Sequence, residues 1–365
     1  MSQTNTSDSA DQQTSPSHTA FTSLPVVDIS GLFSDDLETR KVTAATLDRA
    51  ARDAGFLYLT GHGIEQHEID ALKASAQLFF SQQDDFKQRS YIGLSENHSG
   101  YVPIGEERFY NSDKVDAKEA FDVGFEAEDP VDGKPMTGAN LWPDLPGFRE
   151  GVKPYFDRVV SLSKTLFEGF ALGLGLPEDS FTRHLTAPAN QLRLIHYFHD
   201  PDAAEDVQGI GAHTDYEFFT ILLPTSPGLQ VLNGAGEWIE VPVIPGAFVV
   251  NIGDMMEVIT NGNYVATSHR VRKVREERYS FPMFCNLDYD TVVEPLPELC
   301  ADDAPRYPAV VCGDHLFTQT IHTFRYLQQR VERGELQMPA GAIAPSSFGQ
   351  SEAGQPAWSN EMRGG

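Results

Sequence analysis

The stretch from about residue 191 to residue 284 constrains the fold most, because its hydrophobic pattern alternates with a period of two. Turn signals rich in Gly, Pro and Asn separate its short apolar segments. The predicted strands are Gln191–Phe198, Thr220–Leu223, Leu229–Leu232, Trp238–Val241, Ala247–Ile252, Tyr264–His269 and Arg278–Phe284. Many short strands with frequent turns indicate a sandwich or a barrel.

Helical spacing of apolar residues appears on both sides of this stretch. The predicted helices run from Ser34 or Asp35 to about Ala54, through 69–80, from about 151 to 174, and from about 315 to 331. Gly55 is expected to end the first helix in the C′ position. The next segment, Phe56–Thr60, is expected to be a strand. Helices around one antiparallel β core favour a single domain.

We expect that domain to span residues 23–335, with a helix-rich region at 23–185, the β core at 186–290 and a C-terminal helical region at 291–335. The polar segment 1–22 is predicted to be a disordered tail, and the segment 336–365, rich in small residues, to be a loose tail.

Charge and cysteine content restrict the partners and the compartment. The formal net charge is −26, which argues against nucleic acid or an anionic membrane surface as a partner. The chain has no apolar run long enough for a membrane span and no signal-peptide pattern at its start. Its three cysteines match neither a zinc knuckle nor a disulfide framework, so we expect reduced thiols and a cytoplasmic location.

A candidate metal site lies in the segment Gly211-Ala212-His213-Thr214-Asp215-Tyr216. Among the 11 histidines only His213 is followed by Asp two places later. Residues i and i+2 of a strand face the same side, so His213 and Asp215 can bind one ion, with His269 from a later strand as third ligand. Two His and one carboxylate form the facial triad of non-haem Fe(II) oxygenases. An isolated His-x-Asp pair is more often an ordinary loop feature.

The segment Arg278-Tyr279-Ser280, which follows His269, strengthens this interpretation. By the period of two, Arg278 and Ser280 share one face of a strand. An arginine fork beside a hydroxyl is a good receptor for a carboxylate. Near the iron, the pair is predicted to hold the far carboxylate of a 2-oxo acid whose other end chelates the metal. Without the metal triad, Arg278 would be interpreted as a surface ion-pair residue.

At this point the chain resembles the isopenicillin N synthase-like branch of the Fe(II)/2-oxoglutarate-dependent dioxygenases, from about Leu24 to Val331. The resemblance rests on GAHTDY, on NIGD followed by NG, on SHRV and on ERYS, together with LPVVDISGL and AGFLYLTGHGI near the start. It implies a mainly β fold, a double-stranded β-helix (jelly-roll) core wrapped by N-terminal and C-terminal helices. It also implies Fe(II) at His213, Asp215 and His269, with a carboxylate held by Arg278 and Ser280.

The same family often has Arg-x-Asn-x-Tyr-Pro in a strand that here reads Arg193-Leu194-Ile195-His196-Tyr197-Phe198. This makes Tyr197 a candidate for a hydrogen bond to the cosubstrate carboxylate, although a packed strand tyrosine is the alternative. Ile195 in place of the Asn removes one polar contact of the family pattern.

Substrate residues are less clearly indicated. The stretch around Gly105-Glu106-Glu107 resembles the substrate-side loop of this branch, so Glu107 is a candidate for binding a cationic substrate, with a solvated loop carboxylate as the alternative. Arg193 and Tyr216 are further candidates to contact substrate. Phe121, Phe125 and Phe284 are candidate pocket residues, for which core packing is the default.

The resemblance implies an enzyme that uses Fe(II), O₂ and 2-oxoglutarate to hydroxylate, desaturate or cyclise a small molecule, releasing succinate and CO₂. Two alternative reactions stay open. One is an isopenicillin N synthase-like oxidase that needs no 2-oxoglutarate, and the other is an ethylene-forming type of reaction. A binding protein without activity is the alternative of another class. The residues do not identify the substrate or the oligomeric state.

Overall fold

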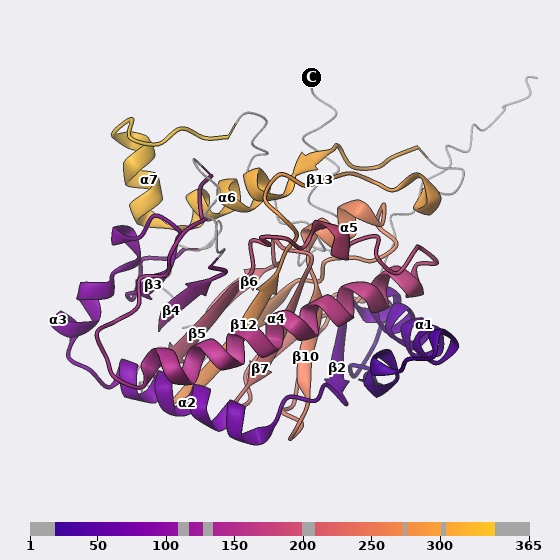
Figure 1. Ribbon diagram of the computed structural model, residues 1–365, viewed down its shortest axis with the longest axis horizontal. Helices are drawn as coiled ribbons and strands as arrows, with labels where there is room; N and C mark the ends of the chain where they lie inside the picture. Colours follow the sequence, from indigo (N-terminus) through magenta and orange to yellow (C-terminus); the bar gives the residue numbers. More distant parts are fainter. Residues whose placement is uncertain are drawn as a thin grey trace, which may run out of the picture.

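Two β-sheets form the centre of the protein in the computed structural model, which describes residues 19–108, 117–126, 134–198, 209–272, 276–300 and 304–339 (Figure 1). Within these residues every strand pairing is antiparallel except that of β1 with β2. In order across the larger sheet, the strands are β1 (Val26–Asp28), β2 (Phe56–Thr60), β10 (Phe248–Ile252), β7 (Phe219–Pro224), β12 (Arg278–Cys285), β5 (Gln191–Tyr197), β4 (Lys118–Gly124) and β3 (Gly100–Val102). The smaller sheet contains β6 (Ile210–His213), β11 (His269–Val271), β8 (Leu229–Leu232) and β9 (Trp238–Glu240), and a separate ribbon pairs β13 (Val292–Val293) with β14 (Val310–Val311).

Three long helices cover one face of the larger sheet. They are α1 (Leu37–Ala54), α2 (Gln66–Phe80) and α4 (Phe148–Gly173), and α4 crosses the sheet diagonally in Figure 1. Apolar side chains of these helices and of the sheet form one continuous buried core. Shorter helical segments are η1 (Ser30–Phe33), α3 (Asp84–Lys87), η2 (Gln88–Ser90), η3 (Ile92–Leu94), η4 (Thr182–His184), α5 (Asp254–Ile259) and η5 (Pro297–Leu299).

The central strands have two buried faces with different chemistry. On β5, Leu192 and Leu194 point into the core under the helices, whereas Arg193 and Tyr197 line a cavity on the opposite face. The neighbouring strand β12 repeats this alternation, since its residues 281 and 283 enter the core and residues 278, 280, 282 and 284 line the cavity. The period of two that predicted the strands therefore also separates the hydrophobic core from the functional face.

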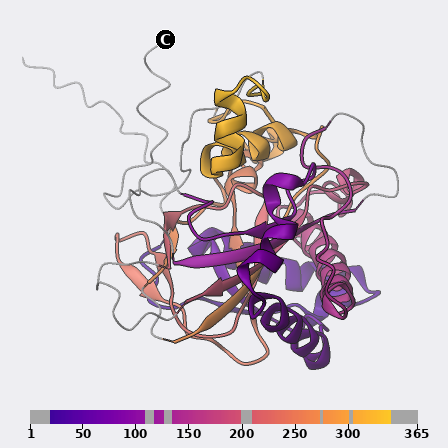
Figure 2. The ribbon, with the colours of Figure 1, turned by 90° about the vertical axis from the view of Figure 1, so that its left-hand side faces the viewer.

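Two helices at the C-terminal end, α6 (Cys312–Thr323) and α7 (Arg325–Glu332), lie together at the top of Figures 1 and 2. The single helix predicted over about 315–331 is thus wrong. Phe324 interrupts it in an extended conformation, with φ −103° and ψ 124°. The amide of Arg325 donates to the carbonyl of Glu106 at 3.0 Å, so a distant loop takes over the hydrogen bonding at the break.

One predicted strand, Tyr264–His269, is also wrong over most of its length, because β11 begins only at His269. Side chains from the preceding helical turn accept the backbone donors that a strand would offer to a neighbour. The Glu257 carboxylate accepts from the Ala266 amide at 2.7 Å, and the Thr260 hydroxyl accepts from the Tyr264 amide at 3.1 Å. The composition of residues 264–268 favours a strand, but hydrogen bonds from their amides to nearby side chains replace the strand pairing.

Helix α1 starts later than expected. Its N-cap is Asp36, whose carboxylate accepts from the Thr39 amide at 2.9 Å, rather than Ser34 or Asp35. Gly55 ends the helix in the left-handed conformation, with φ 62°, which confirms the C′ prediction. The strands β3, β4, β13 and β14 and the helix α5 were not predicted.

The expected tails lie mostly outside the described residues. Where they are described, they contact the body of the protein. The Thr19 amide donates to the Asp53 carbonyl at 3.2 Å, and Phe21 packs against buried residues. At the other end, Leu336 and Met338 pack against a second buried cluster.

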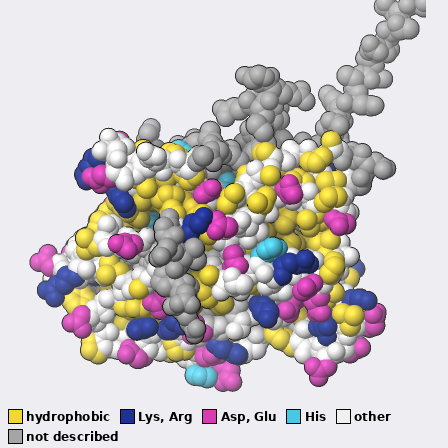
Figure 3. Space-filling model, turned by 45° about the horizontal axis from the view of Figure 1, so that its top comes forward, with side chains coloured by type: hydrophobic (Ala, Val, Ile, Leu, Met, Phe, Trp, Pro, Cys, Tyr) yellow, Lys and Arg dark blue, Asp and Glu magenta, His cyan; other side chains and the backbone are white. Residues whose placement is uncertain are grey.

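The surface in Figure 3 carries acidic and basic side chains next to one another, so the net charge does not form one acidic patch on this face. None of the helices within the described ranges is both long enough and apolar enough to span a membrane.

Candidate metal centre and cosubstrate pocket

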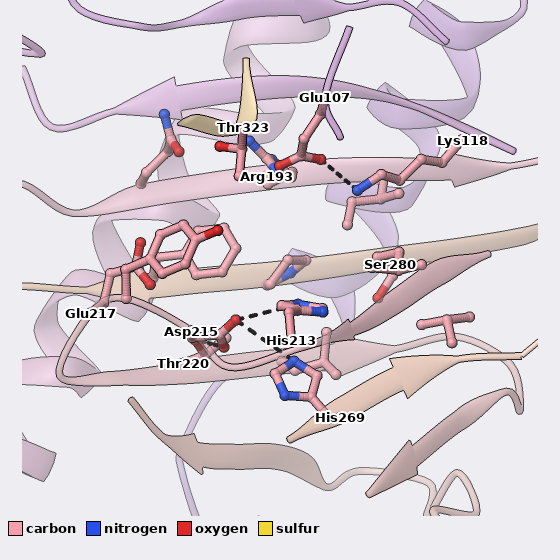
Figure 4. Close-up of a pocket in the computed structure, with 18 of the residues that line it drawn as sticks. Glu107, Lys118, Arg193, His213, Asp215, Glu217, Thr220, His269, Ser280 and Thr323 are labelled. Carbon is pink, nitrogen blue, oxygen red and sulfur yellow. Dashed lines mark hydrogen bonds and ion pairs between the residues drawn. The ribbon is translucent and has the colours of Figure 1, made fainter. Parts of the chain in front are cut away.

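The predicted metal ligands meet where β6 ends and β11 begins. His213 and His269 are directly opposite each other in this antiparallel pair, and their ring centroids are 4.3 Å apart. Asp215 lies two residues beyond the end of β6, not on the strand as predicted, but its carboxylate still lies beside the imidazole of His213. Ligand atoms of the three residues all lie within 4.8 Å of one another. Figure 4 shows the three side chains converging on one point.

Each imidazole is oriented by a backbone carbonyl. Nδ1 of His213 lies 2.8 Å from the Gly211 carbonyl oxygen, and Nδ1 of His269 lies 3.2 Å from that of Thr267. A carbonyl only accepts, so Nδ1 carries the proton and the Nε2 lone pair is left for a ligand. Both Nε2 atoms face Oδ1 of Asp215, at 3.7 Å and 3.6 Å. Burial lowers the pKa of His213 to about 3, which keeps its ring neutral as metal binding requires.

The Asp215 carboxylate is held by two neutral donors. The Thr220 hydroxyl donates to Oδ2 at 2.5 Å, and the Asn251 amide donates to the same oxygen at 2.6 Å. Oδ1 is therefore the oxygen that faces both imidazoles. This donor set, two imidazoles and one carboxylate with no thiolate, fits Fe(II) rather than a structural zinc. Neither Thr220 nor Asn251 was assigned a role from sequence, although Asn251 begins the NIGD motif.

We expect Thr220→Val and Asn251→Leu each to raise the Kd for Fe(II) by about 10- to 100-fold, as loss of a residue that orients a ligand typically does. Either change lets the carboxylate rotate, so that Oδ1 no longer faces both imidazoles. Anaerobic Fe(II) titration measures the effect, and thermal unfolding without iron checks the fold. Thr220→Ser keeps the hydroxyl and is the matched control. Unchanged Fe(II) affinity in both variants would show that Asp215 needs no such support.

All the predicted site residues line one cavity of about 870 Å³, part of which is open to solvent. Its members come from both sheets, from the loop after β3 and from α6. The predicted site residues among them are His213, Asp215 and His269; Arg278, Ser280 and Tyr197; and Arg193, Tyr216 and Glu107. Phe284 also lines the cavity, whereas Phe121 lies in the hydrophobic core and Phe125 packs against that core.

Arg278 is the unusual member of this cavity. Its side chain is only 1% exposed, and its carbon Cζ lies 4.6 Å from the ring centroid of Tyr197, its partner across the strand pair. Nε donates to the Ser226 carbonyl at 3.3 Å, but Nη1 has no hydrogen-bond partner and no carboxylate pairs with the guanidinium among the described residues. A buried cation without a counter-charge is costly, so the arrangement fits a ligand carboxylate.

The wall opposite the metal ligands carries a network of paired charges (Figure 4). Arg193 donates to Asp122 through Nε and Nη2, at 2.7 Å and 2.8 Å, and to Glu107 through Nη1 at 2.6 Å. Lys118 donates to the other oxygen of Glu107 at 2.5 Å, as Figure 4 shows. Burial alone would raise the pKa of Glu107, but Arg193 and Lys118 outweigh it and hold that pKa well below its usual range. Glu107 is therefore not a solvated loop carboxylate, and its charge is already neutralised.

Arg193→Met is expected to lower the free energy of unfolding by about 3–5 kcal/mol, because Asp122 and Glu107 would stay buried without the guanidinium. Urea unfolding measures the change. Arg183→Met removes an exposed arginine whose ion pair with Asp179 is 3.6 Å long, and should cost at most about 1 kcal/mol. If the free energy of unfolding fell equally in the two variants, the buried network would contribute no more to stability than the exposed ion pair.

Comparison with known proteins adds an independent line of evidence. Residues 24–145 match the N-terminal domain of non-haem dioxygenases described for morphine synthesis, and residues 189–287 match the 2OG-Fe(II) oxygenase superfamily. The chain is 35% identical to a homoarginine-6-hydroxylase of Oryza sativa subsp. japonica, over 83% of this chain and 98% of that protein. It is 31% identical to the isopenicillin N synthase of Lysobacter lactamgenus, over 80% of this chain and 94% of that protein.

Solved structures agree with this. A full-length Neurospora crassa protein in complex with alpha-KG is similar with a TM-score of 0.71 and 26% identity, over 85% of this chain and 96% of that one. A putative 2OG-Fe(II) oxygenase family protein from Caulobacter crescentus has a TM-score of 0.72 and 28% identity, over 86% of this chain and 99% of that one. The jelly-roll core with flanking helices is thereby confirmed. Since the relatives match almost end to end and the metal triad lies in one cavity with the buried Arg278, the chain belongs to the 2OG-Fe(II) oxygenase superfamily and is an Fe(II)- and 2-oxoglutarate-dependent dioxygenase that uses O₂.

Proposed function

We propose that His213, Asp215 and His269 hold the Fe(II), and that Arg278, with Ser280 and Tyr197, binds the carboxylate of 2-oxoglutarate remote from the metal. The observation that carries this assignment is the buried guanidinium of Arg278, which pairs with no carboxylate of the described residues and lies in the same cavity as the triad. Ser280 and Tyr197 line that cavity on the same two paired strands, and both are buried. A carboxylate at this place would receive two arginine N–H groups and one or two hydroxyls.

Bound Fe(II) would supply the activation of O₂ that is coupled to oxidative decarboxylation of 2-oxoglutarate. The protein's own contribution is binding, orientation and exclusion of water. Leu222, Leu229 and Val271 line the cavity with apolar surface, which limits the water that could compete with the cosubstrate for Arg278.

The reaction we propose is hydroxylation of a C–H bond in a small guanidino amino acid. One O₂ and one 2-oxoglutarate are consumed, the C–H becomes C–OH with one oxygen atom, and the other oxygen enters succinate as CO₂ leaves. Homoarginine-6-hydroxylases from Oryza sativa and Arabidopsis thaliana, at 35% and 34% identity over nearly their whole lengths, support this substrate class.

The test is O₂ consumption and succinate formation by the anaerobically purified, Fe(II)-loaded protein, with 2-oxoglutarate alone and with L-homoarginine added. We expect slow succinate formation without a primary substrate, a marked acceleration with L-homoarginine, and a product heavier by one oxygen atom. Headspace analysis for ethylene is done in parallel.

Three results would contradict the proposal. O₂ uptake with L-homoarginine but without 2-oxoglutarate would indicate a cosubstrate-free oxidase. Ethylene as the main product would indicate the ethylene-forming reaction. Acceleration by neutral small molecules alone would leave the dioxygenase activity intact but remove the guanidino amino acid as substrate.

A further inference from the structure

Three carboxylates line the cavity within the described part of the chain, and they differ in what neutralises them. Asp215 belongs to the metal triad. Glu107 is bonded to both Lys118 and Arg193. Glu217 makes no hydrogen bond or ion pair with another described residue through its carboxylate, although its side chain is only 6% exposed.

The cofactor and cosubstrate do not supply the missing positive charge. The charges of Fe(II) and Arg278 are offset by Asp215 and the two carboxylates of 2-oxoglutarate. On the opposite wall, Lys118 and Arg193 are offset by Glu107 and by Asp122. With metal and cosubstrate bound, Glu217 is thus the one lining carboxyl group of the described chain that no cation balances. As a lone buried anion it would be costly, and a bound cation would offset that cost.

The backbone holds Glu217 in place next to the metal ligands. It lies two residues after Asp215, and its carbonyl accepts from the Met255 amide at 3.1 Å. The following residue, Phe218, donates to the Cys285 carbonyl at 3.1 Å and accepts from the Gly253 amide at 2.9 Å. These bonds fix the segment from which the side chain projects. Figure 4 shows Glu217 at one end of the cavity, beyond Asp215 and on the far side from Ser280.

We propose that Glu217 binds the guanidinium group of the primary substrate and thereby sets the enzyme's preference for a cationic over a neutral molecule. This inference rests on the proposed function, because it takes the cavity to be the oxygenase active site. A carboxylate can accept two parallel N–H bonds from a guanidinium, which gives orientation as well as charge recognition. Placed on the Asp215 side of the cavity, Glu217 would hold the cationic end of an amino acid close to the metal and leave its other end toward Glu107 and Lys118.

The experiment compares two probes of nearly the same shape. L-homoarginine carries a guanidinium, and L-homocitrulline carries a neutral ureido group of equal length. Their Kd values are measured by calorimetry under anaerobic conditions on the full-length protein loaded with Fe(II) and 2-oxoglutarate. We expect the wild type to bind L-homoarginine about 10- to 100-fold more tightly, the range for a hydrogen bond between charged groups. Glu217→Gln is expected to remove most of this preference by weakening L-homoarginine alone.

Two further variants serve as controls for Glu217→Gln. Glu217→Asp retains the charge on a shorter side chain and should preserve part of the preference. Glu298→Gln removes an exposed carboxylate outside the cavity and should leave the preference unchanged. Thermal unfolding of each variant identifies loss of fold, and the comparison of the two probes in the wild type needs no variant.

Equal affinity of the wild type for the two probes would overturn the proposal, and so would a Glu217→Gln protein that keeps the full preference. Failure of the wild type to bind either probe would also overturn it. Succinate formation from 2-oxoglutarate without any probe tests the proposed function separately. If succinate forms while the probe preference is absent, the proposed role of Glu217 fails and the dioxygenase assignment stands.

Discussion

An Asp215→Ala variant is expected to lose all Fe(II)-dependent O₂ uptake and succinate formation. Asp215 is the one anionic member of the triad, and its Oδ1 lies within 3.7 Å of both imidazole Nε2 atoms. Without it two neutral rings remain, which cannot offset the charge of the ion. The loss of Fe(II) affinity should exceed the roughly 10- to 100-fold expected for the supporting residues Thr220 and Asn251.

Anaerobic Fe(II) titration and oxygen-electrode measurements test this result, with Asp179→Ala as a control that removes an exposed carboxylate. Melting of the iron-free proteins separates lost binding from lost fold, because Ala leaves the Thr220 hydroxyl and the Asn251 amide without their acceptor. Iron-dependent turnover that survives in Asp215→Ala would show that the ion is bound elsewhere.

Local sequence information predicted the parts of the fold that local interactions determine. Gly55 ends α1 because the left-handed conformation there suits glycine. The alternation of β5 and β12 is visible in the sequence because each face of these strands meets a different environment, apolar under the helices and mixed in the cavity. The His-x-Asp spacing predicted that His213 and Asp215 lie together, which the structure shows although Asp215 is beyond the end of β6.

Long-range contacts explain the errors. The break at Phe324 depends on the loop that contains Glu106 and Glu107, which pairs with the chain between α6 and α7. The helical spacing of apolar residues over 315–331 cannot reveal a contact with a loop that is distant in the sequence. The contact between Glu107 and Phe324 places Thr323 and Phe324 among the residues that line the cavity. In the same way, the neutralisation of Glu107 depends on the pairing of β4 with β5, which brings Lys118 and Arg193 to one place.

The role proposed for Glu217 was not predicted, because a single acidic residue in an aromatic segment has no distinctive sequence signal. Its importance appears only when the partners of every charge around the cavity are known. The sequence motifs thus identified the residues that we propose to bind the metal and the cosubstrate, which lie on regular strands or beside them. The other residues that line the cavity come from separate loops, strands and α6.

Arg278→Ala should raise the KM for 2-oxoglutarate by roughly 30-fold to several thousand-fold, corresponding to about 2–5 kcal/mol for truncating one partner of a buried charge pair. Arg278 is 1% exposed and its guanidinium has no carboxylate partner among the described residues, so a bound carboxylate would meet it without displacing an existing ion pair. Initial rates of succinate formation over a range of 2-oxoglutarate concentrations measure the effect.

Arg278→Lys distinguishes charge from geometry. Lysine restores the positive charge but not the two parallel N–H groups, so its KM should fall between those of the wild type and the alanine variant. Fe(II) titration of both variants checks that the metal site survives, since Arg278 is not among the three ligands. If Arg278→Ala kept the wild-type KM, the far carboxylate would have to be held by another group. In that case the guanidinium beside Tyr197 would act only in packing β12 against β5, and its loss would appear in the unfolding free energy instead.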